Sequence, residues 1–356
     1  MNYESRMKIY KLFLYLFLIC DIIAVALYLW LIVSGASQIT SNVKRQTSKF
    51  LIEPSAQSVQ VHPAVLQDAK VNDMAKKQYE RLIDGVMVDK EFINQPLFAI
   101  MLDNLVEPSG LDKASVVYET LVEGGITRFM AIFPAGPTIA DGFKIGPIRS
   151  IRPYFVDWAQ EFGATITHVG GSVAALSKIE ANDIKSLNQF YQDEYFYKDA
   201  NHNAPHHIFT STNLLMAFLQ NFQMIENNFE PWQFVDQSVK VDNALKDVAS
   251  FTVPFARSNI VEWVYDKNTG DYTRYPYNYI KAKNVIVQYT NISVIDDVGR
   301  LKIKTKGVGK AKIFLDGRQI NGKWIKLKTG RTKFYDQSGN EIKFNRGVTW
   351  IEVVKS

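Results

Sequence analysis

A nearly unbroken apolar run, LFLYLFLICDIIAVALYLWLIV at residues 12–33, constrains the fold of this chain most strongly. The run is long enough to cross a bilayer as one helix and too long for the core of a cleavable signal peptide. Arg6, Lys8 and Lys11 precede it, and basic residues favour the cytoplasmic side of a membrane. We therefore expect a single-pass transmembrane signal anchor at residues 12–33. The charges favour a cytoplasmic N-terminus at residues 1–11 only weakly, because Lys44, Arg45 and Lys49 follow the run.

Two residues inside this run bear on how the chain is anchored. Cys20 is the sole cysteine, so neither an intrachain disulfide nor a cysteine-ligated zinc site is possible. The residues before it, FLI, lack the small side chain that a lipid-attachment cysteine needs, which favours an uncleaved anchor over a lipid anchor. Asp21 is costly in lipid, and it either pairs with another helix or is protonated and has no partner.

The rest of the chain divides into three parts. Residues 34–90 are polar and mixed, which is typical of a stalk or linker. Residues 91–230 alternate strand-like runs (LFAIML, SVVYETL, RFMAIF, TITHV) with helix-like stretches (PYFVDWAQEF, NLLMAFLQNF), which predicts an α/β domain with a mixed sheet. Residues 231–356 are rich in β-branched and aromatic residues separated by glycine turns, which predicts an all-β domain. The predicted fold class is thus α/β plus all-β, preceded by one transmembrane helix.

The sequence IGPIRSIRPYF at residues 145–155 places Arg149 and Arg152 just ahead of a helix that Pro153 is expected to begin. A helix N-terminus offers free N–H groups and a partial positive charge, so two guanidinium groups beside it predict an anion-binding site. The alternative is local ion pairing, because Asp157 and Glu161 are close in sequence.

Asp103 and Asn104 follow a strand that reads as buried, at the position where open α/β sheets carry ligand groups. A carboxylate there suits Mg²⁺ or another hard cation, and the alternative is an Asp-Asn turn that caps the local backbone.

Glu119 and Glu123 share one face of a predicted strand. Two carboxylates on one face predict either an acid–base pair or metal ligands. Alternatively, one of them pairs with Arg128 across the Gly124-Gly125 turn.

The histidines His202, His206 and His207 cluster in NHNAPHHIF, a pattern that suggests zinc. Pro205 excludes the helical spacing of an HExxH-type site, however, and no metal ligand set is complete. His168 ends a strand before Gly170 and is placed to face a cleft. For each histidine, a structural hydrogen-bonding role is the alternative.

Composition and motifs exclude several classes of function. The charge of +5 comes from 41 basic and 36 acidic residues spread along the chain, which argues against a nucleic-acid partner. No phosphate-binding or dinucleotide glycine motif supports a nucleotide cofactor. The Gly170-Gly171-Ser172 sequence lacks the Gly-x-Ser-x-Gly elbow of serine hydrolases.

The joint order of motifs resembles the YerB-like family, bacterial envelope lipoproteins whose domain has no assigned function. The motifs are the Asp103-Asn104 strand end, Ser109-Gly110-Leu111, VYETLVEGGITRF, the arginine motif, HVGGS, NAPHHIFTS and the turns GVG and GKW near the C-terminus. The resemblance covers about Leu82 to the C-terminus. It implies that the N-terminus is cytoplasmic and that the domains after the anchor lie outside the cytoplasm. His206 stands at the family's Ala-Pro-His position, whereas His207 stands where relatives usually carry Asn.

Two hypotheses for function remain. In the first, the α/β domain binds a cell-envelope component, such as an anionic or phosphate-bearing wall polymer or precursor, or a protein partner. The expected ligand-binding residues are Asn104, Arg128, Arg149, Arg152 and His168. In the second, the chain is a phosphotransferase or hydrolase acting on envelope polymers, with arginines on phosphate and a carboxylate-bound metal. The candidate catalytic residues are Asp103, Glu119, Glu123 and His206. The first hypothesis is favoured because no nucleophile or metal set is complete.

Overall fold

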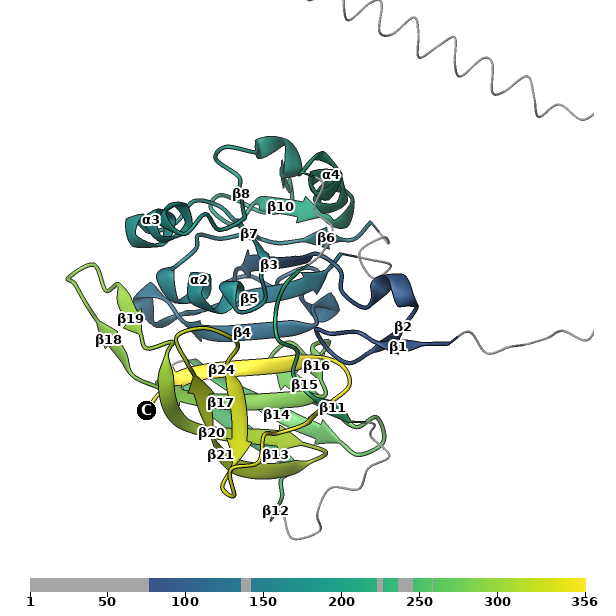
Figure 1. Cartoon of the computed structure of the whole chain (residues 1–356). Helices are drawn as coiled ribbons and strands as arrows, with labels where there is room; N and C mark the ends of the chain where they lie inside the picture. Colours follow the sequence, from purple (N-terminus) through teal and green to yellow (C-terminus); the bar gives the residue numbers. More distant parts are fainter. Residues whose placement is uncertain (1–76, 136–141, 223–226, 236–245, 258) are drawn as a thin grey trace, which may run out of the picture. The chain divides into compact units, whose positions relative to one another are not determined.

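The computed structural model describes residues 77–135, 142–222, 227–235, 246–257 and 259–356, and Figure 1 labels most of its helices and strands. Eleven of the 24 strands in the described residues join one mixed sheet in the order β12-β21-β20-β17-β24-β4-β5-β3-β7-β8, with β22 paired to β21. Their bounds are β3 (Leu97–Leu102), β4 (Val116–Leu121), β5 (Thr127–Pro134), β7 (Thr165–His168), β8 (Ser186–Asn188), β12 (Lys246–Asp247), β17 (Asn284–Thr290), β20 (Gly307–Leu315), β21 (Arg318–Lys326), β22 (Lys333–Asp336) and β24 (Thr349–Lys355).

The C-terminal strand β24 lies in the middle of this sheet. It runs parallel to β17 on one side and parallel to β4 on the other, with Thr349 opposite Asn284 and Val116. Strands buried on both faces are usually continuous apolar runs, and WIEVV in β24 fits this rule except at Glu352. β24 therefore joins the strands of residues 97–188 to those of residues 246–336.

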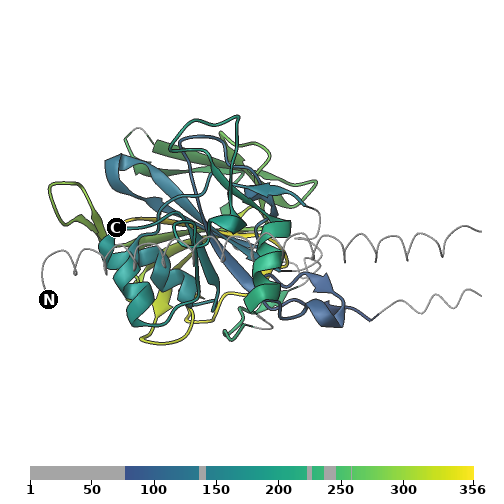
Figure 2. The same cartoon turned by 90° about the horizontal axis from the view of Figure 1, so that it is seen from above.

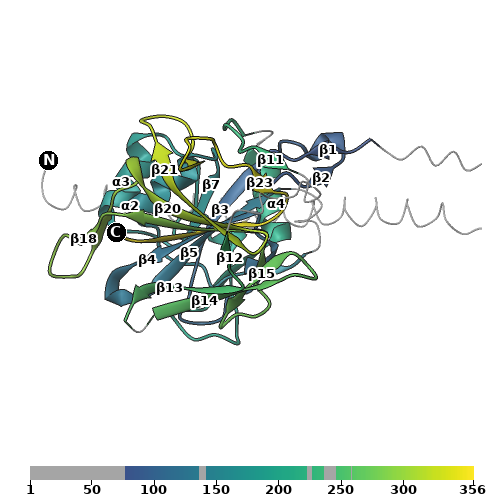
Figure 3. The same ribbon diagram turned by 90° about the horizontal axis from the view of Figure 1, so that it is seen from below.

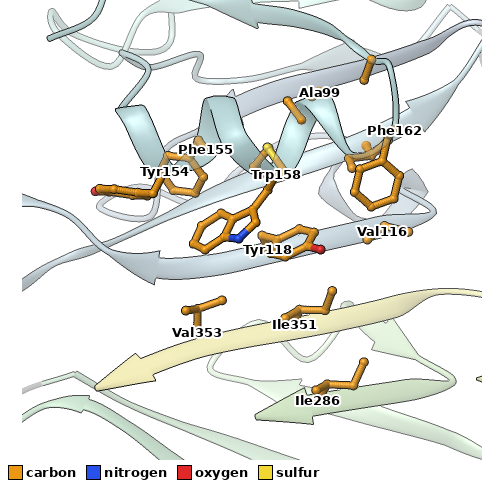
Figure 4. Packing of buried hydrophobic residues seen from close by; sticks show 14 of the residues in the cluster. Ala99, Val116, Tyr118, Tyr154, Phe155, Trp158, Phe162, Ile286, Ile351 and Val353 are labelled. Atoms are coloured by element: carbon orange, nitrogen blue, oxygen red, sulfur yellow. The ribbon is translucent and has the colours of Figure 1, made fainter. Parts of the chain in front are cut away.

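One hydrophobic core fills the first face of the sheet. Helices α2 (Pro153–Gln160) and α3 (Val173–Ala181) cover this face, and Trp158 of α2 stacks on Tyr118 of β4 with ring centroids 5.0 Å apart. Ile351 and Val353 of β24 point into the same core (Figure 4).

A second core fills the opposite face, because alternate residues of a strand point to opposite sides. Trp350 and Val354 of β24 enter this core, together with helix α4 (Thr212–Phe222) and a four-stranded sheet. The strands of that sheet are β13 (Ser250–Ala256), β14 (Asn259–Asp266), β15 (Asp271–Tyr275) and β16 (Lys281–Ala282). This four-stranded sheet packs on the face of the long sheet opposite to the one that α2 and α3 cover, as the views from above and from below show (Figure 2 and Figure 3).

Short elements complete the described structure. The remaining strands are β1 (Tyr79–Glu80), β2 (Met87–Val88), β6 (Lys144–Ile145), β9 (Tyr197–Lys198), β10 (Ile208–Ser211), β11 (Phe234–Val235), β18 (Ile292–Val294), β19 (Leu301–Ile303) and β23 (Phe344–Asn345). Single 3-10 turns lie at Lys90–Phe92, Leu111–Lys113, Glu123–Gly125 and Asp193–Tyr195.

The predicted fold class, α/β plus all-β preceded by one transmembrane helix, is wrong. The described residues are mostly β, and their α-helices have only 8, 9 and 11 residues. None of the described helices is long and apolar enough to span a membrane. The predicted anchor at residues 12–33 lies outside the described residues. The physical reason for the error in the folded part is that β3, β4 and β5 pair antiparallel, so few crossover helices are needed.

Candidate functional site

Several predicted site residues gather where β3 ends. The backbone N–H of Asp103 donates to the carbonyl of Pro147 at 3.0 Å, and the N–H of Arg149 donates to Met101 at 2.8 Å. On the other side, the N–H of Val169 donates to the carbonyl of Arg149 at 3.2 Å. These hydrogen bonds hold Arg149 between the ends of β3 and β7, with its side chain beside Asp103.

The Asp103 carboxylate is buried and has three partners. Oδ1 accepts a hydrogen bond from the backbone N–H of Leu105 at 2.9 Å. This is the turn-capping role that was the alternative interpretation of Asp103. Oδ2 lies 2.6 Å from Nδ1 of His206 and 3.1 Å from Nε of Arg149. The side chains of His206 and Arg149 remain 24% and 21% exposed, so this cluster reaches solvent.

Arg152 is satisfied within the protein at the start of α2. Its Nε and NH2 donate to the two carboxylate oxygens of Glu123 at 2.7 and 2.8 Å, and its NH1 donates to the carbonyl of Ile151 at 3.0 Å. Burial disfavours ionisation of Glu123, but the hydrogen bonds and charge of Arg152, a backbone hydrogen bond and the charge of Arg128 together hold the pKa of Glu123 below its ordinary value. The partners suggested by sequence, Asp157 and Glu161, pair with lysines instead.

Arg128 is the third guanidinium of the cluster and is only 6% exposed. Its NH1 donates to the carbonyl of Ser150 at 2.7 Å, and no described carboxylate lies within ion-pair distance of it. Burial, followed by repulsion from Arg152 and Arg149, lowers the pKa of Arg128 to about 10. Positive charge is therefore in excess around Asp103.

Glu119 is fully buried and pairs with Arg274 of β15 rather than with Arg128. NH2 of Arg274 lies 2.9 Å from both carboxylate oxygens, and its Nε lies 3.1 Å from Oε2. Asn104 Nδ2 and Thr127 Oγ1 donate to Oε1 of Glu119 at 3.2 and 2.7 Å. Glu119 and Asn104 thus belong to a buried network that fastens β15 to β4.

A second buried carboxyl group, Glu352 of β24, lies opposite Glu119 in register. Its Oε1 accepts a hydrogen bond from Nε1 of Trp263 at 2.7 Å. Burial and the charge of Glu119 raise the pKa of Glu352, which favours its protonated form. Arg274 and Glu352 were not predicted, and the only sequence signal for Glu352 is one charged residue within an apolar run.

His168 has the structural role that was the alternative reading of its position. Nδ1 lies 2.7 Å from the carbonyl of Gly170, and Nε2 lies 2.8 Å from Oγ of Ser186. Burial lowers the pKa of His168 to about 4, so the imidazole is neutral at physiological pH. This side chain holds the turn that follows β7.

The three clustered histidines do not converge. Nδ1 of His202 lies 3.1 Å from Asp199, whereas His206 contacts Asp103. Across the described parts of the chain, no group of three or more His, Cys, Asp or Glu side chains is arranged to hold a metal ion. The cluster around Asp103 thus consists of Asp103, Arg128, Arg149 and His206, hereafter the arginine cluster. It reaches solvent through Arg149 and His206, and its chemistry suits an anion.

Comparison with known proteins gives consistent matches along the chain. Two family models match in succession: the protein of unknown function (DUF3048) N-terminal domain over residues 84–225, and the corresponding C-terminal domain over residues 251–351. The protein named "Putative lipoprotein YerB" from Bacillus subtilis (strain 168) is 27% identical over 310 residues, which cover 81% of this chain and 89% of the relative. The crystal structure of the YerB protein from Bacillus subtilis is similar with a TM-score of 0.68 at 26% identity, covering 78% of this chain and 96% of that chain.

Proposed function

The chain belongs to the YerB-like family, whose two domains have no assigned function, and from this premise we propose that it binds an anionic component of the cell envelope through the arginine cluster. The relative's name, lipoprotein, supports a place at a membrane, and we propose that the folded part of this chain is likewise attached to a membrane, outside the cytoplasm.

The observation that carries the proposal is the charge balance around Asp103. The positive charges of Arg128 and Arg149 repel each other. After burial, repulsion from Arg152 and Arg149 contributes to lowering the pKa of Arg128 to about 10. Arg152 pairs with Glu123 and Arg149 pairs with Asp103, whereas Arg128 has no described carboxylate within ion-pair distance. An incoming phosphate or carboxylate would relieve this repulsion and accept charge-assisted hydrogen bonds from the partly exposed guanidinium group of Arg149.

The test is binding of inorganic pyrophosphate and purified anionic wall polymers to the full chain by calorimetry, with and without Mg²⁺. Arg149→Gln should weaken binding about tenfold or more, because it removes a charged hydrogen-bond donor. Arg300→Gln is the matched control, since Arg300 is half-exposed and pairs only with Asp296. No saturable binding to any of these anions, or equal affinity of wild type and Arg149→Gln, would reject the arginine cluster as the site.

A second candidate function, hydrolysis or transfer at phosphate, is favoured by the Asp103–His206 contact. Nδ1 of His206 lies 2.6 Å from Oδ2 of Asp103, and no described residue hydrogen-bonds its Nε2. A carboxylate that orients an imidazole in this way leaves the other ring nitrogen available as a general base. The described residues give no support to the carboxylate-bound metal that the enzymatic hypothesis included.

Binding and catalysis separate at His206. If the chain is an enzyme, His206→Gln should reduce turnover of a wall-polymer substrate by about 100-fold or more while leaving ligand affinity nearly unchanged. Arg149→Gln should reduce affinity under either candidate. Full turnover in His206→Gln protein would remove the enzymatic candidate.

A further inference from the structure

A groove opens on the long sheet where β20 and β21 extend beyond β17. β17 pairs with β20 as far as Gln288 opposite Ala311, while β20 and β21 continue together to Gly307 opposite Lys326. The groove has a volume of about 880 Å³. It lies on residues that the arginine cluster does not use.

The groove face of β20 changes from apolar to basic along the strand. Phe314 stacks on Phe251 of β13 with ring centroids 3.5 Å apart, and this contact belongs to the second core. Lys312 and Lys310 follow on the same face, because alternate residues of a strand share a face. On this face of β20, the side chains that the four-stranded sheet does not cover are therefore cationic.

Four lysines contribute to the groove lining, and all four are at least partly exposed: Lys304, Lys310, Lys312 and Lys323. None of them forms an ion pair with a described residue. The one acidic side chain of the lining, Asp336, accepts hydrogen bonds from the backbone and side-chain nitrogens of Asn340 at 2.8 and 3.0 Å. Among the lining side chains, the four cations outnumber the one anion.

The register brings two of these lysines directly together. Lys310 lies opposite Lys323 in the antiparallel pair of β20 and β21. Like charges at directly opposed positions destabilise a sheet, and no described carboxylate forms an ion pair with either lysine. A bound polyanion would supply that compensation.

We propose that this groove is a second binding site, which takes a linear polymer with regularly spaced phosphate or carboxylate groups. Lys310, Lys312 and Lys323 would contact successive charged groups, because they are spread along two adjacent strands. Sites for single-stranded nucleic acid rely on several stacking aromatic side chains, whereas Tyr289 is the only aromatic residue that lines this groove among the described residues. This groove shares no residue with the arginine cluster. A negative binding result at one site therefore does not affect the proposal for the other.

The experiment measures binding of inorganic polyphosphate to the full chain, carried out in the Arg149→Gln background so that the arginine cluster does not contribute. Lys310→Gln/Lys323→Gln should weaken binding about tenfold or more and reduce its salt dependence, because two charged contacts are lost. Lys310→Arg/Lys323→Arg should retain binding, since the charge is kept.

Lys302→Gln/Lys328→Gln is the charge-matched control, because both lysines are exposed and neither lines the groove. Three outcomes would overturn the proposal: no polyphosphate binding by the parent chain, equal losses in the control and groove variants, or a groove-dependent preference for oligo-dT over polyphosphate. The last outcome would identify a nucleic-acid site instead.

Discussion

At the scale of single residues, the buried charges of the second core are the most consequential feature of this protein. Glu119 and Arg274 are separated by 155 positions in sequence, yet they form a bidentate ion pair with side-chain exposures of 0% and 1%. Arg274 also lies over the rings of Phe129 and Tyr277, each 5.3 Å from the guanidinium carbon. Breaking a buried pair costs more than removing both partners, because one charge is left without compensation.

Arg274→Met should therefore lower the free energy of unfolding by about 3–5 kcal/mol. Arg274→Met/Glu119→Gln should recover part of that loss, since it removes the stranded charge. Urea denaturation followed by circular dichroism measures both variants. If the free energy of unfolding of Arg274→Met lies within about 1 kcal/mol of the wild-type value, the ion pair does not stabilise the fold.

Glu352 should make stability fall as the pH rises. The unfolded chain releases the proton of this carboxyl group near pH 4.5, whereas burial and the Glu119 charge keep the folded form protonated to higher pH. The folded state then binds more protons, so the free energy of unfolding decreases above about pH 4.5.

Glu352→Gln should remove this pH dependence and raise the melting temperature at pH 8 more than at pH 4, because the amide stays neutral and still accepts from Trp263. Thermal melts of the two proteins between pH 4 and pH 8 provide the measurement. Parallel curves for wild type and variant would contradict the raised pKa of Glu352.

The sequence predicted those features of the site that depend on residues close together in the chain. The sequence around Arg149, Arg152 and Pro153 predicts a helix start, and α2 begins at Pro153 with Arg152 as its N-cap residue. It does not show which arginine keeps an exposed guanidinium group, because Glu123 is 29 positions away. That outcome depends on how β4 and β5 turn at Gly124-Gly125.

At the scale of elements, periodicity and length located the strands and helices well. LFAIML, RFMAIF and TITHV form parts of β3, β5 and β7, and PYFVDWAQEF forms α2. The run VTWIEVV lies in the part of the chain predicted to be all-β, and it contains most of β24. Its partners β4 and β17 were not predicted, because parallel pairing carries no turn residues that mark it in sequence.

Deletion of residues 349–356 should prevent formation of the native fold, because β4 and β17 each lose a fully hydrogen-bonded neighbour. Far-ultraviolet circular dichroism and amide hydrogen exchange report the loss. Deletion of Ser356 alone is the control, since it removes one backbone hydrogen bond to Thr290. Native exchange protection of β4 in the longer deletion would contradict the central position of β24.

At the scale of the whole molecule, one sheet and two shared cores connect residues 97–188 to residues 246–355. The change of composition near residue 231 predicted a boundary between domains, and the positions of the domains stay a prediction. The fold class failed because strand pairing between distant segments is decided by tertiary packing, not by local pattern.

The described residues should accordingly unfold in one transition. Trp158 lies among α2, β4 and β24, whereas Trp263 lies in the second core on β14, so fluorescence from variants that each retain one of these tryptophans reports separate regions. Coincident denaturation midpoints are expected, because disrupting either core exposes β24. Midpoints that differ by more than experimental error would show two independently stable units.

The position of β24 also has a consequence for how the protein is made. Synthesis proceeds from the N-terminus, so β4 and β17 both exist before the strand that separates them. Until residues 349–355 emerge, each of those strands presents an unpaired edge, and such edges promote aggregation. An incomplete chain therefore cannot close its sheet, and a protease or chaperone that recognises open strand edges can distinguish it from the finished protein.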